Sequence, residues 1–352
     1  MTTEIENNVP IPTQKKPRKP RTGRAEKDKP KEASGAERLI SALKFISLAQ
    51  KPEGTPYQVH SYISNHWALA FDGVLSIGCP IVEDLSACPN TFRLLAALSK
   101  CGQEYSIAQT NLLTLAVKSQ RFKATIECIA ADSLATSYPD IPLGPIDDRI
   151  KEGLKQLSWI PTEGAERAFA ACILLQDQTM VATDSHCILE YFHSISLPND
   201  IMIPKASVMA MLKIDKKLAK FGFSSDSFTF WYEDGSYLKT QLFKDKFPAY
   251  QQIFNKMDTG ITQVPAEFFE GIRTVAPFIK DKIVMFRPGK ICTSNDPDIG
   301  ASYEIAGLPD SNWNYELLLN MEPHFENVSF RSDAMQVFFN KGTLRGSIMG
   351  IK

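Results

Sequence analysis

Residues 173–192, ILLQDQTMVATDSHCILEYF, contain two apolar stretches separated by a short polar segment. The β-branched and aromatic residues in both stretches are typical of strands on a half-buried sheet surface. Asp184 and Ser185 lie between them, and such short polar side chains bond to nearby backbone groups in turns. The stretch therefore predicts a β-hairpin that turns at Asp184 and Ser185, with His186 as a partly buried residue after the turn.

Two motifs, in order and correctly spaced, resemble one protein family. VATDSHCIL at 181–189 resembles the strand–turn–strand of the second domain in bacterial DNA polymerase III beta subunits, the sliding clamps. KTQLFKDKFPAYQQIF at 239–254 resembles the strand and the Phe-Pro-x-Tyr turn between the second and third domains of that family. Residues 112–129, LLTLAVKSQRFKATIECI, resemble more weakly the closing hairpin of its first domain. Together these motifs identify a divergent clamp, and an origin in a phage or plasmid is one alternative.

The resemblance covers about residues 37–352 and implies an α+β fold of three repeated sliding-clamp domains. In such a fold, helices line a channel and antiparallel sheets lie outside. The hydrophobic patterns repeat one plan of helices and strands three times. We expect a tail at 1–36 and clamp domains at 37–138, 139–261 and 262–352. The predicted helices are 37–50, 90–100, 146–158, 204–219 and 265–279. The predicted strands are 57–63, 67–71, 74–78, 104–108, 112–117, 121–129, 166–175, 178–183, 187–194, 228–232, 236–243, 283–287, 290–293, 301–306, 314–319, 326–331, 335–339 and 344–351.

The third domain departs from the family plan. Two helices are implied in each domain, but only residues 320–326, NMEPHFE, stand where its second helix should be. Pro323 would break so short a helix, because proline removes a backbone hydrogen bond and clashes with the preceding turn. We therefore expect five good helices, with the sixth shortened to a turn.

Composition and charge indicate an intracellular protein with a basic tail. The seven cysteines include no CxxC pair, which is typical of reduced thiols in a cytosolic protein. No apolar run reaches the ~18 residues of a membrane span, and the N-terminus lacks the apolar core of a signal peptide. We therefore expect a soluble, cytoplasmic protein that does not bind membranes and, as a bacterial clamp, associates with the nucleoid.

Residues 1–36 carry nine Lys or Arg against five Asp or Glu, a net charge of +4. The rest of the chain carries 30 against 35, a net charge of −5. Six of the cations fall between Lys15 and Arg24 with prolines among them, so this segment is expected to be disordered. A solvated extension, a nucleic-acid-tethering arm and a localisation signal all remain open for this tail.

The sequence contains no enzyme signature. It lacks GxxxxGK[ST], GxGxxG, HExxH and GxSxG, and its histidines show no metal-ligand spacing. Asp184 and His186 are an alternative catalytic pair, although catalytic triads are assembled from residues distant in sequence. We therefore expect a binding protein without a catalytic site, metal or cofactor.

Basic residues recur on the predicted helices. Lys213, Lys217 and Lys220 are spaced to share one face of the predicted helix at 204–219. A solvated surface is the ordinary role of any single lysine, but basic helices on an acidic body suit sequence-independent contacts with DNA phosphates. The candidate DNA-channel residues are Arg93, Lys100, Arg149, Lys151, Lys155, Lys205, Lys213, Lys217, Lys220, Arg273 and Lys280.

The resemblance also implies an apolar pocket between domains two and three, which accepts a short, partly hydrophobic peptide motif from polymerases and the clamp loader. Ser185 and Cys187 replace the usual Gly and Arg of the family, and Met349-Gly350-Ile351 replaces Met-Pro-Met, so the peptide preference is expected to differ. The matching positions are Ala170, Thr183, Ser185, His186, Cys187, Ile188, Pro248, Gln252, Ile253, Ile348, Met349, Gly350 and Ile351.

The function implied by the resemblance is that of a DNA polymerase processivity factor. Two subunits would close head to tail into a homodimeric ring around double-stranded DNA, and the ring would tether the replicative polymerase and other replication or repair proteins. A clamp loader would open it. The alternative is a non-ring DNA-binding scaffold protein with clamp-like domains, in which the basic tail supplies most of the DNA affinity.

Overall fold

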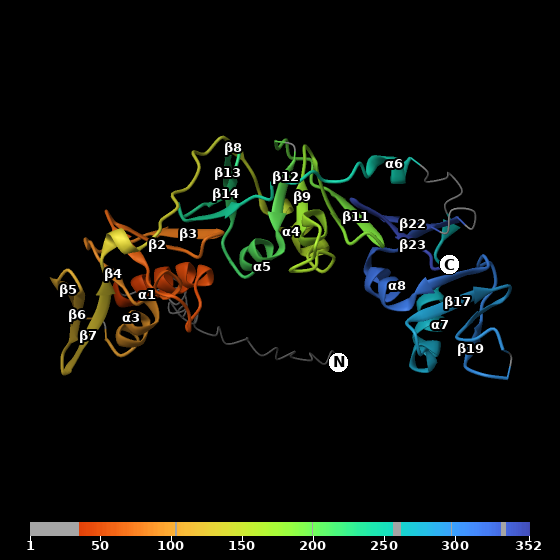
Figure 1. Ribbon diagram of the computed structural model, residues 1–352, viewed down its shortest axis with the longest axis horizontal. Coiled ribbons are helices and arrows are strands. Elements are labelled where there is room, and N and C mark those ends of the chain that lie inside the picture. Colours follow the sequence, from red (N-terminus) through yellow and green to blue (C-terminus); the bar gives the residue numbers. More distant parts are fainter. Residues whose placement is uncertain (1–34, 103, 199, 256–261, 297, 332–335) are drawn as a thin grey trace, which may run out of the picture. The chain divides into compact units, whose positions relative to one another are not determined.

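Antiparallel strand pairs build four sheets in the part of the chain that the structure describes (Figure 1). The computed structural model describes residues 35–352 except 103, 199, 256–261, 297 and 332–335. The predicted basic tail therefore lies outside the described residues, apart from Gly35 and Ala36, which begin the first helix. No helix in the described part is both long and apolar enough to cross a membrane.

The first helix, α1 (Gly35–Ile46), packs on a sheet through an apolar stripe. Leu39, Leu43 and Ile46 are fully buried, at the spacing that places side chains on one face of a helix. The helix contacts two strands and a second helix, and a 3₁₀ turn follows it. These elements are β2 (Trp67–Phe71), β3 (Leu75–Pro80), α3 (Thr91–Leu98) and η1 (Ser47–Ala49).

Local capping explains one confirmed and one wrong prediction in this part of the chain. Asn90 caps α3, because its side chain accepts a hydrogen bond from the Arg93 amide at 3.0 Å. The strand predicted at 57–63 is wrong at its start, where α2 (Pro56–Val59) forms one helical turn. Proline is favoured at a first helical position, so only β1 (Tyr62–Ser64) remains extended.

Two sheets contain the strands from β1 to β8 together with β13, β14 and β15. One has the order β4-β7-β6-β5 and the other β1-β2-β3-β15-β14-β13-β8. In the second sheet β3 pairs with β15, so strands far apart in the sequence share one sheet. The additional elements here are β4 (Cys88–Pro89), β5 (Ser106–Asn111), β6 (Thr114–Ser119), β7 (Phe122–Ile129), η2 (Ala131–Ser133), β8 (Gly144–Pro145), β13 (Leu218–Phe223), β14 (Ser227–Tyr232) and β15 (Tyr237–Gln241).

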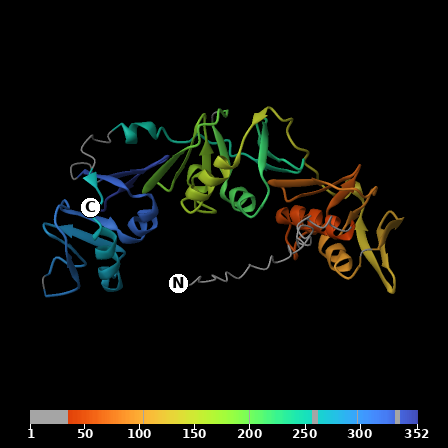
Figure 2. The same ribbon diagram turned by 180° about the vertical axis from the view of Figure 1, so that it is seen from behind.

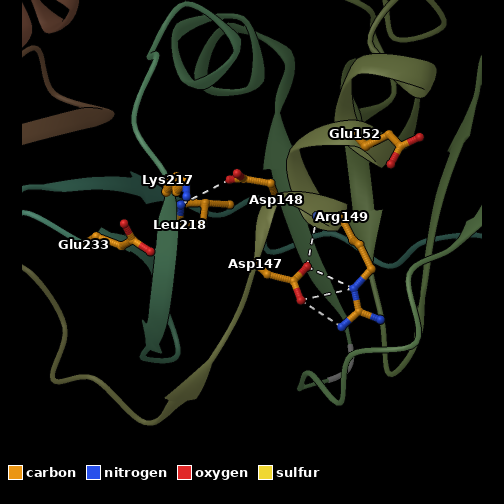
Figure 3. A pocket seen from close by; sticks show the side chains of 7 residues that line it. All are labelled: Asp147, Asp148, Arg149, Glu152, Lys217, Leu218 and Glu233. Carbon is orange, nitrogen blue, oxygen red and sulfur yellow. Dashed lines mark hydrogen bonds and ion pairs between the residues drawn. The ribbon is translucent and has the colours of Figure 1, made fainter. Parts of the chain in front are cut away.

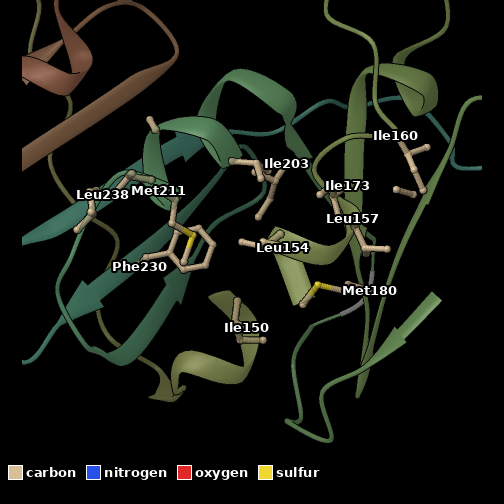
Figure 4. Packing of buried hydrophobic residues seen from close by; sticks show 14 of the residues in the cluster. Ile150, Leu154, Leu157, Ile160, Ile173, Met180, Ile203, Met211, Phe230 and Leu238 are labelled. Carbon is tan, nitrogen blue, oxygen red and sulfur yellow. The ribbon is translucent and has the colours of Figure 1, made fainter. Parts of the chain in front are cut away.

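Two helices lie side by side in the middle of the chain in both views (Figures 1 and 2). They are α4 (Asp148–Leu157) and α5 (Lys205–Leu212). The α4 residues Ile150, Leu154 and Leu157 are fully buried and lie in one cluster with side chains from the neighbouring strands (Figure 4). This apolar stripe confirms the helix that the spacing of the sequence predicts.

The helix predicted at 204–219 is too long. It ends at Leu212, with Lys213 as its C-cap, and Leu218–Phe223 form β13 instead. Pairing with β14 buries Leu218 and Phe221, so tertiary contacts override the local helical pattern. The predicted helical face of Lys213, Lys217 and Lys220 therefore does not exist.

The largest sheet has the order β12-β9-β10-β11-β23-β22-β21-β16. A methyl group at Gly346 would overlap both Phe339 and Leu189, which shows how closely β23 packs at its junction with β11. The predicted strand at 166–175 is extended only from Cys172. The elements are η3 (Ala168–Ala171), β9 (Cys172–Leu175), β10 (Thr179–Thr183), β11 (Cys187–Phe192), β12 (Ile201–Pro204), α6 (Gln251–Phe254), β16 (Thr262–Gln263), β21 (Asn327–Arg331), β22 (Gln336–Lys341) and β23 (Leu344–Met349).

The last sheet, in the order β19-β18-β17-β20, is followed by a helix that the sequence did not predict. The strand expected at 314–319 is wrong, because Asn314 caps α8 by accepting the Glu316 and Leu317 amides at 3.0 and 3.2 Å. The expectation that the sixth helix is shortened to a turn is also wrong, because α8 has seven residues, one fewer than α7, and continues into a 3₁₀ turn that accommodates Pro323. The elements are α7 (Phe268–Val275), η4 (Ala276–Phe278), β17 (Ile283–Arg287), β18 (Lys290–Cys292), β19 (Ser302–Glu304), β20 (Ser311–Asn314), α8 (Tyr315–Met321) and η5 (Glu322–His324).

Candidate partner pocket and DNA-facing surface

The β10–β11 hairpin forms as predicted and turns at Asp184 and Ser185. One Asp184 carboxylate oxygen accepts the backbone amides of His186 and Cys187, each at 2.8 Å. Ser185 adopts a positive φ of 80°, which tight turns of this kind require. The Asp184 carboxylate therefore acts as a turn cap, which is a structural role.

One face of the largest sheet carries an apolar cluster that is separate from the main core. Along β9, Ile173 and Leu175 point into the main core, whereas Cys172 and Leu174 point to the other side, as strand alternation requires. We call this second set the outer cluster. Its buried members are Cys172, Leu174, Val181, Ile188, Met202, Phe247, Tyr250, Phe254 and Phe338, and Phe169 and Ile253 pack against it.

The segment 247–254 covers the outer cluster with aromatic rings. The Phe247 ring lies 6.2 Å from the Phe169 ring and 6.1 Å from the Tyr250 ring, both edge-on. The Tyr250 hydroxyl lies 3.0 Å from Gln176 Oε1 and 3.1 Å from Glu190 Oε1. Burial, followed by the nearby Glu190 carboxylate, raises the pKa of Tyr250 to about 12, so the hydroxyl keeps the proton that it donates.

Several predicted pocket residues meet around this cluster. Ile188 and Ile253 both belong to it. Thr183 Oγ1 donates to the Cys187 carbonyl at 2.7 Å, which closes the hairpin. The Met349 amide donates to the His186 carbonyl at 2.8 Å, so the C-terminal strand reaches the turn, and the Met349 side chain is 43% exposed.

The remaining pocket positions are less buried or lie on the wrong side of the sheet. Cys187 and Ile348 are opposite each other in the β11–β23 register and belong to the main core. Burial raises the pKa of the Cys187 thiol, so it stays protonated. These two side chains do not line the outer face. Ser185, His186, Pro248 and Gln252 are exposed, and Ala170, Gly350 and Ile351 are half-buried. The prediction that His186 is partly buried is therefore wrong, because the hairpin turn carries its side chain into solvent.

The sequence did not single out two charged residues beneath the covering segment. Glu190 is 6% exposed, and its Oε2 accepts a hydrogen bond from Arg345 Nε in an ion pair. The Arg345 guanidinium carbon lies 4.3 Å from the centre of the Phe254 ring. A signal existed, because Glu190 interrupts the apolar string CILEYF on the same strand face as Ile188.

The candidate DNA residues on α4 lie beside acidic side chains. A cavity of about 570 Å³ is lined by Asp147, Asp148, Arg149, Glu152, Lys217, Leu218 and Glu233 (Figure 3). Arg149 pairs with Asp147 at 2.8 Å and donates to Ser194 Oγ at 2.6 Å. The hydrogen bonds from Arg149 hold the pKa of Asp147 below its ordinary range. The charge of Arg149 is therefore already balanced.

Two other candidate lysines in this part of the chain donate hydrogen bonds to backbone carbonyls. Lys151 Nζ donates to the Lys216 carbonyl at 2.9 Å, and Lys205 Nζ donates to the Pro161 carbonyl at 2.6 Å. Lys155 and Lys213 line a second cavity, of about 540 Å³, together with three acids. These acids are Asp148, Glu152 and Asp215. We call the surface around both cavities the α4 surface, and its charges are of both signs.

The remaining candidates are spread over separate elements. Arg93 pairs with Glu127 at 3.2 Å, and Arg273 pairs with Glu322. Lys100 and Lys280 follow the ends of α3 and η4, and Lys220 lies in β13. Within the described ranges, no group of three His, Cys, Asp or Glu side chains is placed to hold a metal ion.

No protein-family model and no curated protein matches the sequence, but solved structures do. The DNA polymerase III subunit beta of Pseudomonas aeruginosa aligns with a TM-score of 0.74 at 13% identity, over 90% of this chain and 98% of that chain. The chain has the sliding-clamp fold. The predicted α+β architecture of three repeated clamp domains is therefore confirmed.

Two further clamps show the same likeness. The Bacillus subtilis sliding clamp aligns with a TM-score of 0.71 at 16% identity, over 91% of this chain and 98% of that chain. The Helicobacter pylori beta clamp, in a structure bound to a DNA ligase peptide, aligns with a TM-score of 0.71 at 14% identity, over 91% and 99%. The match therefore extends over nearly the whole length of each clamp.

Proposed function

We propose that this protein is a divergent beta sliding clamp and acts as a DNA polymerase processivity factor without chemistry of its own. The observation that best supports this proposal is that the fold match covers 98% of the P. aeruginosa clamp and 90% of this chain. A processivity clamp needs the complete three-domain architecture, because its action depends on enclosing DNA. The proposed domains span 37–138, 139–261 and 262–352, and the proposed place of action is the bacterial cytoplasm, on replicating DNA.

The proposed ring is a head-to-tail homodimer. Among the described residues, β7 has a second neighbouring strand only at its C-terminal end, where β4 pairs with it, and β19 pairs only with β18. Both sheets therefore present backbone edges of the kind that pair with another chain. Exposed Arg121 and Lys123 flank the start of β7, and exposed Glu304 ends β19, so the two edges are complementary in charge.

Enclosure, more than attraction, is the proposed means of holding double-stranded DNA. The α4 surface carries acids beside most of its cations, so it offers a weak, sequence-independent attraction to phosphates. Exposed Lys155, Lys213 and Lys217 are the proposed phosphate contacts there. Lys151 and Lys205 donate to backbone carbonyls and are proposed to contribute less.

The outer cluster and its rim form the proposed partner pocket. Apolar floor residues with an exposed methionine and a few polar groups suit a short, partly hydrophobic peptide. We propose that the replicative polymerase and clamp loader bind here, and that the ligase peptide of the H. pylori clamp binds at the same place. The proposed lining includes Ala170, Thr183, Ser185, His186, Ile188, Pro248, Gln252, Ile253, Met349, Gly350 and Ile351, with Cys187 and Ile348 supporting it from the core side.

Native mass is the first test of this function. The subunit mass is 39.3 kDa, so light scattering should give about twice that value over a range of concentrations, as a two-fold closed assembly requires. After loading on a nicked circle, the dimer should be retained until the circle is linearised, since a ring slides off free ends. A monomer at all concentrations, released equally from circles and linear DNA, would overturn the proposal.

The balanced charge of the α4 surface favours one second candidate, a non-ring scaffold whose tail at residues 1–34 supplies the DNA affinity. Deleting residues 1–34, which precede α1, separates the two functions. A clamp lacking this segment should still stimulate processive synthesis on circular templates. Loss of all DNA association on that deletion, with the rest of the chain folded, would favour the scaffold.

A further inference from the structure

An ion pair between a buried glutamate and a half-exposed arginine joins the two halves of the largest sheet where β11 meets β23. Glu190 and Arg345 are directly opposite in the antiparallel register, and Arg345 Nε donates to Glu190 Oε2. The Glu190 side chain is 8% exposed and the Arg345 side chain 47%. A carboxylate buried this far needs such a partner, because removing its water is strongly unfavourable.

Both members of the pair also hold the covering segment. Glu190 Oε1 lies 3.1 Å from the Tyr250 hydroxyl, and the Arg345 guanidinium stacks over the Phe254 ring with its carbon 4.3 Å from the ring centre. Gln176 Oε1, at 3.0 Å from the same hydroxyl, completes the anchor. The segment is therefore fixed at a residue just before α6 and at the last residue of α6.

The two anchors flank residues that belong to the proposed pocket. Gln252 and Ile253 lie between Tyr250 and Phe254, and Ile253 packs against the outer cluster. Glu190 is two residues after Ile188, so both side chains lie on the same face of β11. The ion pair thus connects the floor of the pocket to one of its walls.

We propose that Glu190 and Arg345 are positioning residues of the partner pocket. Their ion pair, acting through Tyr250 and Phe254, holds α6 against the sheet in the free protein, so that the wall formed by Gln252 and Ile253 is present before a peptide arrives. This inference rests on the proposed function. A wall fixed in advance raises affinity, because less conformational freedom is lost on binding.

Substitutions of the anchors test the proposal. Tyr250→Phe keeps the ring packing and removes the hydroxyl, while Glu190→Gln keeps the side-chain size and removes the charge. Each should weaken binding of the H. pylori ligase peptide by roughly tenfold, the effect of losing one charge-assisted hydrogen bond. Hydrogen exchange at residues 251–254 should become faster in both. The matched control is Glu127→Gln, which breaks the exposed pair with Arg93 and should change neither quantity.

A charge swap separates positioning from stability. In the double variant Glu190→Arg with Arg345→Glu, the ion pair is restored, but a carboxylate cannot stack on Phe254 as the guanidinium does. Thermal stability should therefore recover towards wild type while peptide affinity and the exchange rates stay impaired. Recovery of thermal stability, peptide affinity and exchange rates together would show that the pair only stabilises the junction of β11 and β23. Unchanged affinity in Tyr250→Phe and Glu190→Gln would show the same. Either result would overturn the proposal.

Failure of the inference is distinguishable from failure of the proposed function. Wild-type protein that forms the dimer and binds the peptide, with variants that bind it equally well, overturns the inference alone. Wild-type dimer that binds no peptide overturns the pocket and the inference together. Wild-type protein that is monomeric and is released from circular DNA overturns the clamp function, whichever way the variants behave.

Discussion

The outer cluster and the α4 surface use their side chains in opposite ways. The outer cluster buries aliphatic and aromatic groups around one ion pair, and the covering segment closes over it. The α4 surface is rich in charge, but much of that charge is matched by nearby acids or by backbone carbonyls. One region is therefore an apolar cluster with an ion pair at its edge, and the other is a surface that carries charges of both signs.

This difference suits the proposed clamp function, in which the protein would both slide and recruit partners. Recruitment needs specificity, which buried apolar groups with a few placed polar atoms provide. Sliding needs contacts that are weak, exchangeable and independent of sequence. Exposed lysines that contact DNA phosphates provide such contacts. Substitutions in the outer cluster should therefore have large and local effects, whereas substitutions on the α4 surface should have small effects that depend on salt.

The largest effect is expected at Met349. Met349→Asp places a carboxylate at the rim of the pocket, where a partly hydrophobic peptide would remove its water and Gln336 Nε2, 3.0 Å from Met349 Sδ in the wild type, would replace only part of it. Affinity for the H. pylori ligase peptide, measured by fluorescence anisotropy, should fall by at least roughly a hundredfold, or about 2.7 kcal/mol. Leu112→Asp, at a side chain that is 81% exposed outside the outer cluster, is the control. If a folded Met349→Asp dimer still bound the peptide, the peptide pocket could not lie on this face of the sheet.

Two neighbours on β11 sharpen the distinction between the faces of the sheet. Ile188 belongs to the outer cluster and Leu189 to the main core, and both are nearly inaccessible. Truncation of either to alanine should cost about 2–4 kcal/mol of unfolding free energy, because each leaves a cavity. Only Ile188→Ala should also weaken peptide binding, and Cys187→Ala should leave it unchanged. Equal losses of affinity at 188 and 189 would contradict the assignment of faces.

The sequence predicted the fold through its strands and missed details where tertiary contacts decide. The hairpin at Asp184 and Ser185 was predictable because its turn chemistry is local. The helix expected at 204–219 and the strand expected at 314–319 were wrong, because pairing of β13 with β14 and capping by Asn314 outweighed the apolar pattern. The domain boundaries and the assembly into a ring stay predictions.

The same distinction between local and tertiary contacts separates the site residues that the sequence could predict from those that it could not. Family resemblance placed Ile188, Ile253 and Met349 near one surface, but strand alternation alone would have assigned Cys187 and Ile348 to the opposite face. Glu190 and Arg345 could not be paired from the sequence, since their contact depends on the register between β11 and β23. Charge counting likewise could not show which lysines donate to backbone carbonyls.

A smaller effect is expected on the α4 surface. Lys217→Gln should lower affinity for nonspecific duplex DNA about twofold and reduce the slope of log affinity against log salt by about one, as for one phosphate contact. Lys151→Gln should change the slope less, because its ammonium group donates to the Lys216 carbonyl. Both are measured by anisotropy titrations at several salt concentrations. Equal slopes in wild type and Lys217→Gln would exclude Lys217 from the DNA-facing set.

The smallest effect concerns His193, which directly follows β11. Its side chain is 1% exposed, and its Nδ1 accepts the Ile195 amide at 3.1 Å. Burial lowers the pKa of His193 below its ordinary value of 6.5, against the opposing effect of backbone groups at Thr179 and Gln176, and the charge of Arg149 lowers it further. Because the unfolded chain then binds more protons, stability should decrease as the pH falls through 6.5.

Replacing this histidine isolates its contribution. His193→Asn keeps an acceptor for the Ile195 amide but cannot be protonated, so the difference in Tm between about pH 8 and about pH 5 should be smaller than in wild type. His324 is also buried with a lowered pKa and remains in the variant, so the pH dependence should shrink without vanishing. An unchanged pH dependence would mean that the pKa of His193 is the same in the folded and the unfolded chain. The lowered pKa of Asp147 cannot substitute for it, because that carboxylate also loses stability as the pH falls, but only through 3.8, below the range compared here.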